Sequence, residues 1–185
     1  MKTPRLRWLL FFIVFGFSIG YCIGQAEQFV EPDFAVPDSL VSTHFKLKPL
    51  SRKYAEKDYQ AVMQSIDHLK GVFGPQSEWP PKNLTLEDNQ WDASLHENEF
   101  TKRKAFTYSV LSHKEDSVLG CVYIYPSSKK GYDAEIAMWV TTSRFNRGMD
   151  SILFLEVKKW VAARWPFKRI AYVGREISWE EWLTK

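Results

Sequence analysis

Residues 118–160 hold the feature that most restricts the fold of this chain. The first strand-like stretch reads VLGCVYIYP, the polar turn after it SSKKGY, and the second strand-like stretch DAEIAMWV. A short basic segment, TTSRFNRG, then leads into the apolar run MDSILFLEVKKW. This pattern predicts a β-hairpin whose second strand continues through a loop into a helix. Since the dipole and the first-turn amides of a helix both attract negative charge, the loop at 141–148 is a predicted anion-binding site.

The rest of the chain supplies further strands and helices. Strand 118–125 is apolar on both faces, which predicts a central strand covered on both sides. A strand–helix–strand crossover joins 133–140 to 169–173, so these two strands should run parallel while the others run antiparallel. The sequence therefore predicts an α/β fold with a twisted, mostly antiparallel mixed sheet flanked by helices. The predicted elements are strand 45–50, helices 54–69 and 86–100, strands 104–112, 118–125 and 133–140, helix 149–164, strand 169–173 and a short closing helix.

Helix 86–100 begins with a recognisable capping pattern. Thr85 is a favourable N-cap residue, and Asp88 three residues later resembles the acidic member of a capping box. We therefore expect reciprocal hydrogen bonds between these two residues.

Acidic and basic residues are balanced over most of the chain. The formal net charge of +3 comes from 25 Lys and Arg residues against 22 Asp and Glu residues. Lys2, Arg5 and Arg7 account for the whole excess, because residues 1–24 contain no acid. Proteins that bind nucleic acid carry a basic surface, so this balance argues against a nucleic-acid partner.

The N-terminus has the character of a targeting segment. A basic head precedes an uncharged run, residues 8–26, which as a helix would be about 28 Å long and would nearly span a bilayer. Residues 1–26 are therefore predicted to be a signal peptide or a membrane anchor, and the sequence leaves both open. Either one predicts an anchored or exported protein, with membrane association through residues 8–26.

The segment that follows differs in composition from the rest. Residues 27–43 contain prolines, several acids and no helical period, which predicts an extended tether. The folded domain is expected to cover residues 44–185.

The sequence predicts neither a metal site nor a disulfide. Cys22 lies in the apolar N-terminal run and Cys121 in a predicted strand, where a thiol behaves as a small hydrophobe. His96 and Glu99 lie one helical turn apart, but no third ligand follows at a usual spacing. For this pair we expect a solvated helix face.

The order of the predicted elements resembles that of the GNAT superfamily of N-acetyltransferases. The resemblance covers residues 45–182, and the segments LGCVYIYP, AEIAMWV, WPF and GREISW are similar to a subgroup of GNAT-like proteins. It implies a GNAT-like fold in which the two parallel strands splay apart and the pantetheine arm of acetyl-CoA lies between them. It also implies acetyl-CoA as co-substrate and a small-molecule or peptide amine as acceptor.

The resemblance makes the loop before the last long helix the expected coenzyme A site. In the family this loop reads Gln or Arg, two residues, Gly, one residue and then Gly or Ala, and Gly148 matches the central glycine. Phe145 stands where Gln or Arg is expected, and Asp150 stands where Gly or Ala is expected. An acid there would repel a pyrophosphate, and Arg144 and Arg147 would offset that repulsion. If the loop binds no anion, Asp150 is a first-turn acid that favours the helix dipole. The residues expected to bind the cofactor are Val140, Thr141, Arg144, Asn146, Arg147, Gly148 and Met149.

Acetyl transfer to an amine needs a base for the amine and an acid for the leaving thiolate. GNAT enzymes often carry a carboxylate on the strand before the loop, and Glu135 occupies that place, so the resemblance implies Glu135 as the base. The alternative for Glu135 is a solvated strand-end residue or a salt-bridge partner. The family's acid is often a tyrosine just after the second parallel strand. Tyr172 lies within that strand, so the acid stays unassigned.

Two functions remain open on this basis. The element order and the Arg-rich loop favour an N-acetyltransferase. The divergent loop and the apparent export favour a non-catalytic, membrane-tethered or exported GNAT-like domain that binds a ligand or a partner protein, since acetyl-CoA is a cytoplasmic metabolite.

Overall fold

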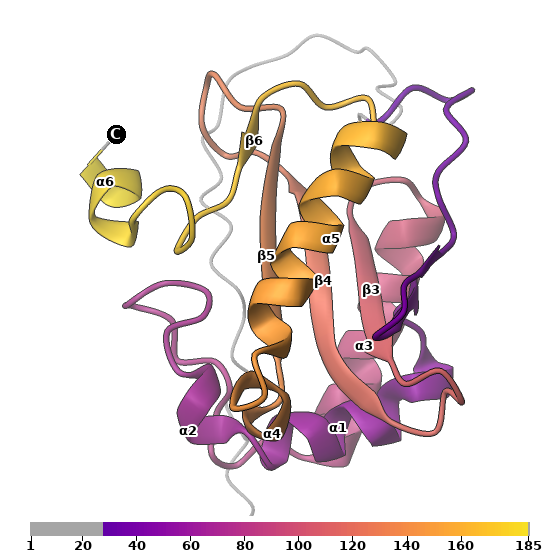
Figure 1. Ribbon diagram of the computed structural model, residues 1–185, viewed down its shortest axis with the longest axis vertical. Helices are drawn as coiled ribbons and strands as arrows, with labels where there is room; N and C mark the ends of the chain where they lie inside the picture. The colour runs from indigo at the N-terminus through magenta and orange to yellow at the C-terminus, as the bar shows by residue number, and fades with distance from the viewer. Residues whose placement is uncertain (1–27, 185) are drawn as a thin grey trace, which may run out of the picture.

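A mixed sheet of six strands forms the centre of the computed structural model, which describes residues 28–184 (Figure 1). The strands lie side by side in chain order, and each neighbouring pair is antiparallel except β5 and β6, which are parallel. The predicted mixed sheet with one parallel pair is therefore confirmed. The strands are β1 (Leu40–Val41), β2 (Lys46–Pro49), β3 (Phe106–Leu111), β4 (Val118–Pro126), β5 (Ala134–Val140) and β6 (Ile170–Ala171).

Helices cover both faces of this sheet. Figure 1 shows α5 crossing in front of the sheet and α3 behind it, while α6 stands apart beside the β6 edge. The helix between β5 and β6 spans the same residues as the sequence predicts, 149–164. The helices are a 3₁₀ turn at Arg52–Tyr54, α1 (Ala55–Met63), α2 (Ile66–Leu69), α3 (Leu86–Thr101), α4 (Thr142–Phe145), α5 (Met149–Arg164) and α6 (Trp179–Thr184).

Strand β4 is central and buried on both faces, as its continuous apolar sequence predicts. Val122 and Ile124 belong to the buried cluster that contains Val157 of α5. Cys121 belongs to a second cluster, on the opposite face, together with Val62 of α1. Because successive side chains of a strand point to opposite faces, an apolar run without alternation can fill both clusters at once.

The predicted helix 54–69 is interrupted in the structure. Residues 64 and 65 separate α1 from α2, and the buried hydroxyl of Ser65 accepts a hydrogen bond of 3.1 Å from the backbone amide of Thr142. The hydrophobic residues keep their helical spacing across residues 64 and 65, so the sequence pattern predicts one continuous helix there. A tertiary contact to the loop after β5 therefore sets the boundary of both helices.

The start of α3 has the predicted capping box. The amide of Asp88 donates to the hydroxyl of Thr85 at 3.1 Å, and the amide of Thr85 donates to the carboxylate of Asp88 at 3.2 Å. Two first-turn donors without a helical partner are satisfied in this way.

Residues 28–43, which the sequence predicts as a tether, lie against the domain. The ring of Phe29 stacks on that of Phe167 with centroids 4.6 Å apart, and Val30 is buried in the cluster that α5 covers. The guanidinium of Arg103 donates to the carbonyl of Phe34 at 2.8 Å, and β1 pairs with β2. The segment is largely extended, but its apolar side chains cover the edge of the core. The predicted signal peptide or anchor, residues 1–26, lies outside the described residues.

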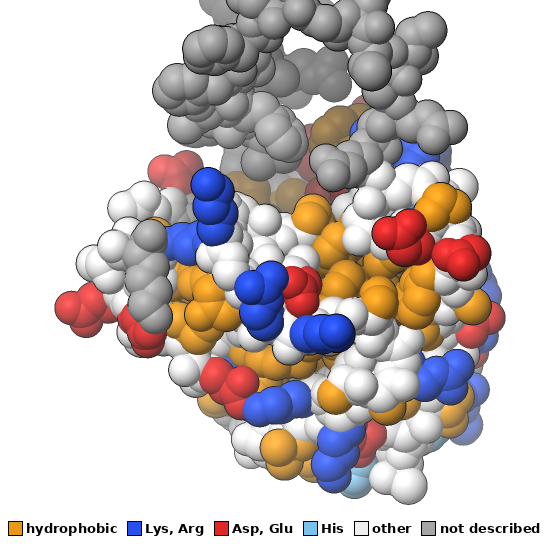
Figure 2. Space-filling view, turned by 90° about the horizontal axis from the view of Figure 1, so that it is seen from above, with side chains coloured by type: hydrophobic (Ala, Val, Ile, Leu, Met, Phe, Trp, Pro, Cys, Tyr) orange, Lys and Arg blue, Asp and Glu red, His pale blue; other side chains and the backbone are white. Residues whose placement is uncertain are grey.

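The described part of the chain contains no helix that is long and apolar enough to cross a membrane. On the face shown in Figure 2, basic and acidic side chains are interspersed around hydrophobic ones, so neither sign of charge dominates that face.

Strands β5 and β6 are joined at one end only. They pair through Ala134 with Ile170 and through Glu135 with Ala171. Just before this pairing, the carboxylate of Asp133 accepts hydrogen bonds from the backbone amides of Lys168 at 2.8 Å and of Arg169 at 2.9 Å. These backbone bonds, together with the Arg169 guanidinium, lower the pKa of Asp133 to about 2. Asp133 therefore fastens the closed end of the parallel pair.

Asp133→Asn should reduce the acid sensitivity of the fold. Because the folded-state pKa of Asp133 is about 2 and its ordinary value is 3.8, the carboxylate stabilises the protein above the ordinary value and loses this contribution as the pH falls toward 2. The variant should melt at a lower temperature than the wild type near neutral pH, and the two melting temperatures should converge in acid. Thermal denaturation followed by circular dichroism across this pH range measures the effect. A difference in melting temperature that does not change with pH would contradict it.

Candidate functional site

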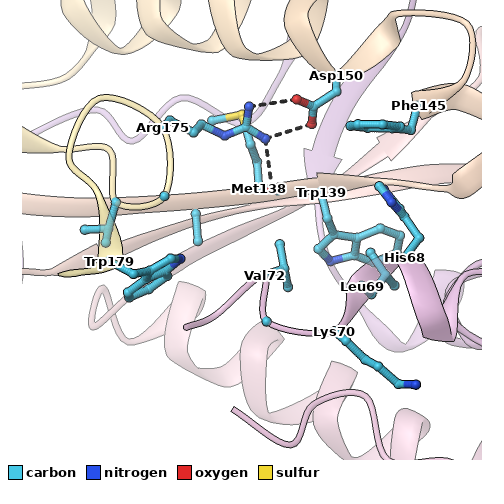
Figure 3. Close-up of a pocket in the computed structure, with 14 residues that line it drawn as sticks. His68, Leu69, Lys70, Val72, Met138, Trp139, Phe145, Asp150, Arg175 and Trp179 are labelled. Atoms are coloured by element: carbon cyan, nitrogen blue, oxygen red, sulfur yellow. Dashed lines mark hydrogen bonds and ion pairs between the residues drawn. The ribbon is translucent and has the colours of Figure 1, made fainter. Parts of the chain in front are cut away.

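A cavity of about 260 Å³ opens beside β5, beyond the point where its pairing with β6 ends (Figure 3). Strand β5 supplies one wall, the turn after β6 supplies another, and the segment around α2 and the start of α5 complete the lining. Figure 3 shows Trp179 at one end of this cavity and Phe145 with His68 at the other. The lining residues are His68, Leu69, Lys70, Gly71, Val72, Ala137, Met138, Trp139, Phe145, Asp150, Val173, Gly174, Arg175 and Trp179.

An ion pair between Arg175 and Asp150 forms part of the cavity lining. The two guanidinium Nη atoms of Arg175 donate to the two carboxylate oxygens of Asp150, at 2.9 and 2.8 Å. One of these nitrogens also donates to the backbone carbonyl of Met138 on β5, at 3.2 Å (Figure 3). The side chains of Arg175 and Asp150 are only 18% and 22% exposed. A bidentate, charge-assisted pair of this kind is both strong and specific in geometry.

A tight turn after β6 positions Arg175. The amide of Gly174 donates to the carbonyl of Ile177 at 2.7 Å, and the amide of Arg175 donates to the carbonyl of Tyr172 at 3.2 Å. Gly174 has a φ of +76°, and a Cβ there would come within 2.8 Å of the indole nitrogen of Trp179. Only glycine fits this position without strain, because φ and the close indole both exclude a side chain. The turn therefore holds Arg175 toward β5.

The sequence did not single out Arg175 as a site residue. It belongs to the GREISW segment and lies 25 residues after Asp150 in the chain. The signal available was the opposite charge of these two residues, one at the start of the crossover helix and the other just after its second strand. That signal is weak, because charged pairs of this spacing are common in sequences and few of them meet.

The predicted phosphate loop includes the one-turn helix α4 and ends at Gly148. The amides of Arg144, Arg147 and Gly148 donate to carbonyls inside the loop. Gly148 has a φ of +75°, and a Cβ placed there would meet no atom within 4 Å. The space in front of Gly148 is therefore open to a ligand, and the first-turn amides of α5 have no partner within their helix.

The predicted cofactor residues lie in this loop and at its two ends, and none of them lines the cavity. Val140, Thr141 and Met149 are buried, whereas Asn146 and Arg147 are exposed. Arg144 is half-buried, and within residues 28–184 neither arginine of the loop takes part in an ion pair. The loop thus offers two cations and a helix N-terminus, which suit an anionic group.

The two residues that depart from the family pattern have other contacts. The ring of Phe145 is 48% exposed and packs on the ring of His68, with centroids 4.5 Å apart. Asp150 lies in the first turn of α5, as expected, and its charge is neutralised by Arg175. The repulsion that Asp150 would exert on an anion is therefore weaker than the sequence implies.

Glu135 lies near the closed end of the parallel pair. Its Oε1 atom accepts hydrogen bonds from the hydroxyl of Ser127 at 3.0 Å and from the amide and hydroxyl of Ser128 at 2.7 and 2.8 Å. Glu135 does not line the cavity, but Ala137, two residues further along β5, does. Since alternate residues of a strand share a face, Glu135 lies on the face of β5 that carries Ala137 and Trp139.

Tyr172 is buried on the α5 side of the sheet. It is 3% exposed, its ring meets that of Phe154 edge-on, and burial raises its pKa to about 12. It does not line the cavity. The general acid therefore stays unassigned.

His96 is buried, so the expectation of a solvated helix face is wrong for this residue. Its Nδ1 atom lies 3.2 Å from the carboxylate of Glu99 and 3.2 Å from the hydroxyl of Thr107, and its Nε2 atom lies 3.5 Å from the carboxylate of Asp92. Burial alone would lower the pKa of His96, but the hydrogen bond to Glu99 and the neighbouring carboxylates raise it. Among residues 28–184, no three His, Cys, Asp or Glu side chains converge as metal ligands would.

The described residues thus combine a mixed sheet, whose parallel pair opens on one side, with a glycine-containing loop and a helix N-terminus beside the opening. No protein-family model and no curated protein sequence matches the chain. Solved structures do match: a GnaT-family acetyltransferase from Bordetella pertussis (14% identity, TM-score 0.56, 76% of this chain and 81% of that one) and a ribosomal-protein-S5-alanine acetyltransferase from Vibrio fischeri (16%, 0.57, 75% and 75%). A third match is the ribosomal L7/L12 alpha-N-protein acetyltransferase RimL in complex with coenzyme A (18%, 0.56, 71% and 71%). At these identities the likeness shows the GNAT fold.

Proposed function

We propose that the chain is an N-acetyltransferase that transfers an acetyl group from acetyl-CoA to an amine. The observation that carries this proposal is the opening between β5 and residues 173–175, which lies directly beside the N-terminus of α5. Such an opening gives a thioester and an amine one shared cavity, while the helix N-terminus offers donors to a phosphate. The coenzyme A named for one of the matching structures supports the same co-substrate here.

The residues of the phosphate loop fit the anionic part of acetyl-CoA. Gly148 leaves space for close approach, and Arg144 and Arg147 supply positive charge beside it. In this proposal Thr141 and Asn146 contribute polar groups at the two ends of α4, and buried Val140 and Met149 fix the backbone on either side. Acetyl-CoA would supply the activated acyl group, and the chain would bind and orient it.

Glu135 is the proposed base. An amine attacks a thioester only as the free base, so a carboxylate must accept the proton of the ammonium group. Glu135 lies on the face of β5 that also carries two cavity-lining residues, and three hydrogen bonds fix its carboxylate. A small molecule or the N-terminus of a peptide is the proposed acceptor. The printed names of two matching structures, which describe acetyltransferases of ribosomal proteins, support a peptide amine.

The alternative is a non-catalytic GNAT-like domain, membrane-tethered or exported through residues 1–26, that binds a ligand or a partner. One observation favours it: Arg175, paired with Asp150, donates a hydrogen bond to the Met138 carbonyl of β5, along which the arm of acetyl-CoA is proposed to lie. A domain that no longer binds acetyl-CoA could keep this ion pair permanently.

Calorimetric titration of the full chain with coenzyme A separates the two functions. The enzyme proposal expects a saturable signal with coenzyme A and a weaker one with ADP, which has the diphosphate but lacks the pantetheine arm. Acetyl-CoA should then release free thiol when an accepted amine is added. If the folded protein shows no signal with coenzyme A, the enzyme proposal is wrong and the non-catalytic domain is favoured.

A further inference from the structure

The outer edge of β5 has no neighbouring strand beside the cavity. Among the described residues, the pairing of β5 with β6 ends at Glu135 and Ala171, while β5 continues to Val140. An unpaired strand edge offers alternating N–H and C=O groups to an extended ligand that carries amides. The pantetheine arm of coenzyme A carries two amides, so this edge is the natural place for it.

One group on this edge is already occupied. The carbonyl of Met138 accepts a hydrogen bond from the Arg175 guanidinium at 3.2 Å. An extended ligand cannot bond to this carbonyl from the same side while the guanidinium is there, because both would occupy one volume. Arg175 and the arm therefore exclude each other.

Arg175 is held in this position from three directions. Asp150 accepts both of its Nη groups, Met138 accepts one of them, and the guanidinium carbon lies 5.2 Å from the centre of the Phe154 ring. Gly174 and Trp179 fix the turn below it. These contacts come from α5, from β5 and from the turn itself, so the guanidinium is fixed against the edge of β5 at Met138.

A second ion pair fastens the same turn to α5 but lies outside the cavity. Lys158 contacts Glu176, and their side chains are 45% and 43% exposed. Neither residue lines the cavity. This pair provides a matched control, because breaking it loosens the turn without removing the guanidinium from β5.

We propose that Arg175 is a gate residue, held closed by Asp150, which must leave the carbonyl of Met138 before the arm of an acyl-CoA can lie along β5. This gate rests on the proposed acetyltransferase function. It also makes the site selective. Asp150 lies in the first turn of α5, where the pyrophosphate is proposed to bind, so the pyrophosphate competes with Asp150 for the bidentate guanidinium. Coenzyme A can therefore open the gate through its pyrophosphate, whereas a bare pantetheine arm binds only when the gate is already open.

Binding of coenzyme A and of free pantetheine to the full chain tests the gate. Wild-type protein should bind coenzyme A but only weakly bind pantetheine. Arg175→Ala should lower the dissociation constant of pantetheine by about tenfold, as expected if the gate is open about a tenth of the time. Asp150→Ala should change pantetheine binding in the same direction, because the guanidinium loses its anchor. Lys158→Ala should leave both dissociation constants unchanged within about twofold, the precision usual for additive, uncoupled sites.

Several outcomes would overturn the gate. Equal pantetheine affinity in the wild type and in both cavity variants, with coenzyme A binding intact, refutes the gate and leaves the proposed function standing. A loss of coenzyme A affinity in Arg175→Ala, with pantetheine unaffected, would make Arg175 an anion ligand instead. If Lys158→Ala gains as much pantetheine affinity as the cavity variants do, general loosening of the turn is the cause and the gate is refuted. If neither the wild type nor any variant binds coenzyme A or pantetheine, although all of these proteins melt cooperatively, the gate and the proposed function both fail.

Discussion

Glu135→Gln should lower the rate of acetyl transfer by about 10²- to 10⁴-fold and leave coenzyme A affinity nearly unchanged. Gln has the same shape as Glu and can still accept the hydrogen bonds from Ser127 and Ser128, but it cannot accept the proton of an ammonium group. Glu135 also lies outside the proposed pyrophosphate site, which begins at Val140, the last residue of β5. The loss should therefore appear in the chemical step and not in binding.

The measurement is the release of free thiol from acetyl-CoA, followed over a series of pH values with small amines and with peptides that have a free N-terminus. Ser127→Ala is the matched control, because it removes one hydrogen bond to Glu135 and keeps the carboxylate, so its rate should change far less. Unchanged turnover of Glu135→Gln at every pH, with any accepted amine, would remove Glu135 from the mechanism. Its carboxylate would then only fasten the turn between β4 and β5.

The sheet and its main covering helix could be predicted from the sequence because their patterns are local. The unbroken apolar run of β4 marks a strand buried on both faces, and Pro166 marks the end of α5. The break at Ser65 could not be predicted, because its cause is a hydrogen bond to Thr142, which is remote in the chain. The docking of residues 28–43 was missed for a similar reason. Prolines and acids suppress any period there, while Phe29 and Val30 still pack on the core.

The candidate site was predictable only where it follows the chain. Gly148 could be placed at a helix N-terminus from the loop sequence, and the structure puts it there in a left-handed conformation. Arg175 could not, because β6 is two residues long and the turn after it is shaped by Gly174 and Trp179. Considered from the loop sequence alone, Asp150 is an acid that would repel an anion at this site. Paired with Arg175, Asp150 is half of a neutral ion pair. A residue outside the phosphate-loop motif therefore decides how strongly Asp150 repels an anion.

Gly148→Val should greatly weaken coenzyme A binding. The loss should be on the order of 100-fold, because two charge-assisted hydrogen bonds of about 1.5 kcal/mol each would no longer form. The structural reason is the open space in front of Gly148, where a Cβ meets no protein atom and would instead stand in the path of the pyrophosphate. The same substitution also strains the backbone. A β-branched residue at a φ of +75° costs about 1–3 kcal/mol, so the melting temperature of this variant should fall as well.

Gly148→Asn separates the blocked site from the strained backbone. Asn tolerates the left-handed conformation, so this variant should melt close to the wild type while its side chain still fills the space in front of the loop. Calorimetric titration of both variants with coenzyme A, beside their melting curves, gives the comparison. The pyrophosphate site predicts that both variants lose coenzyme A affinity and that only the valine variant loses much stability. If Gly148→Asn binds coenzyme A as tightly as the wild type, the pyrophosphate does not lie against this loop. The anion would then have to be held elsewhere, and Arg144 and Arg147 would be ordinary surface charges.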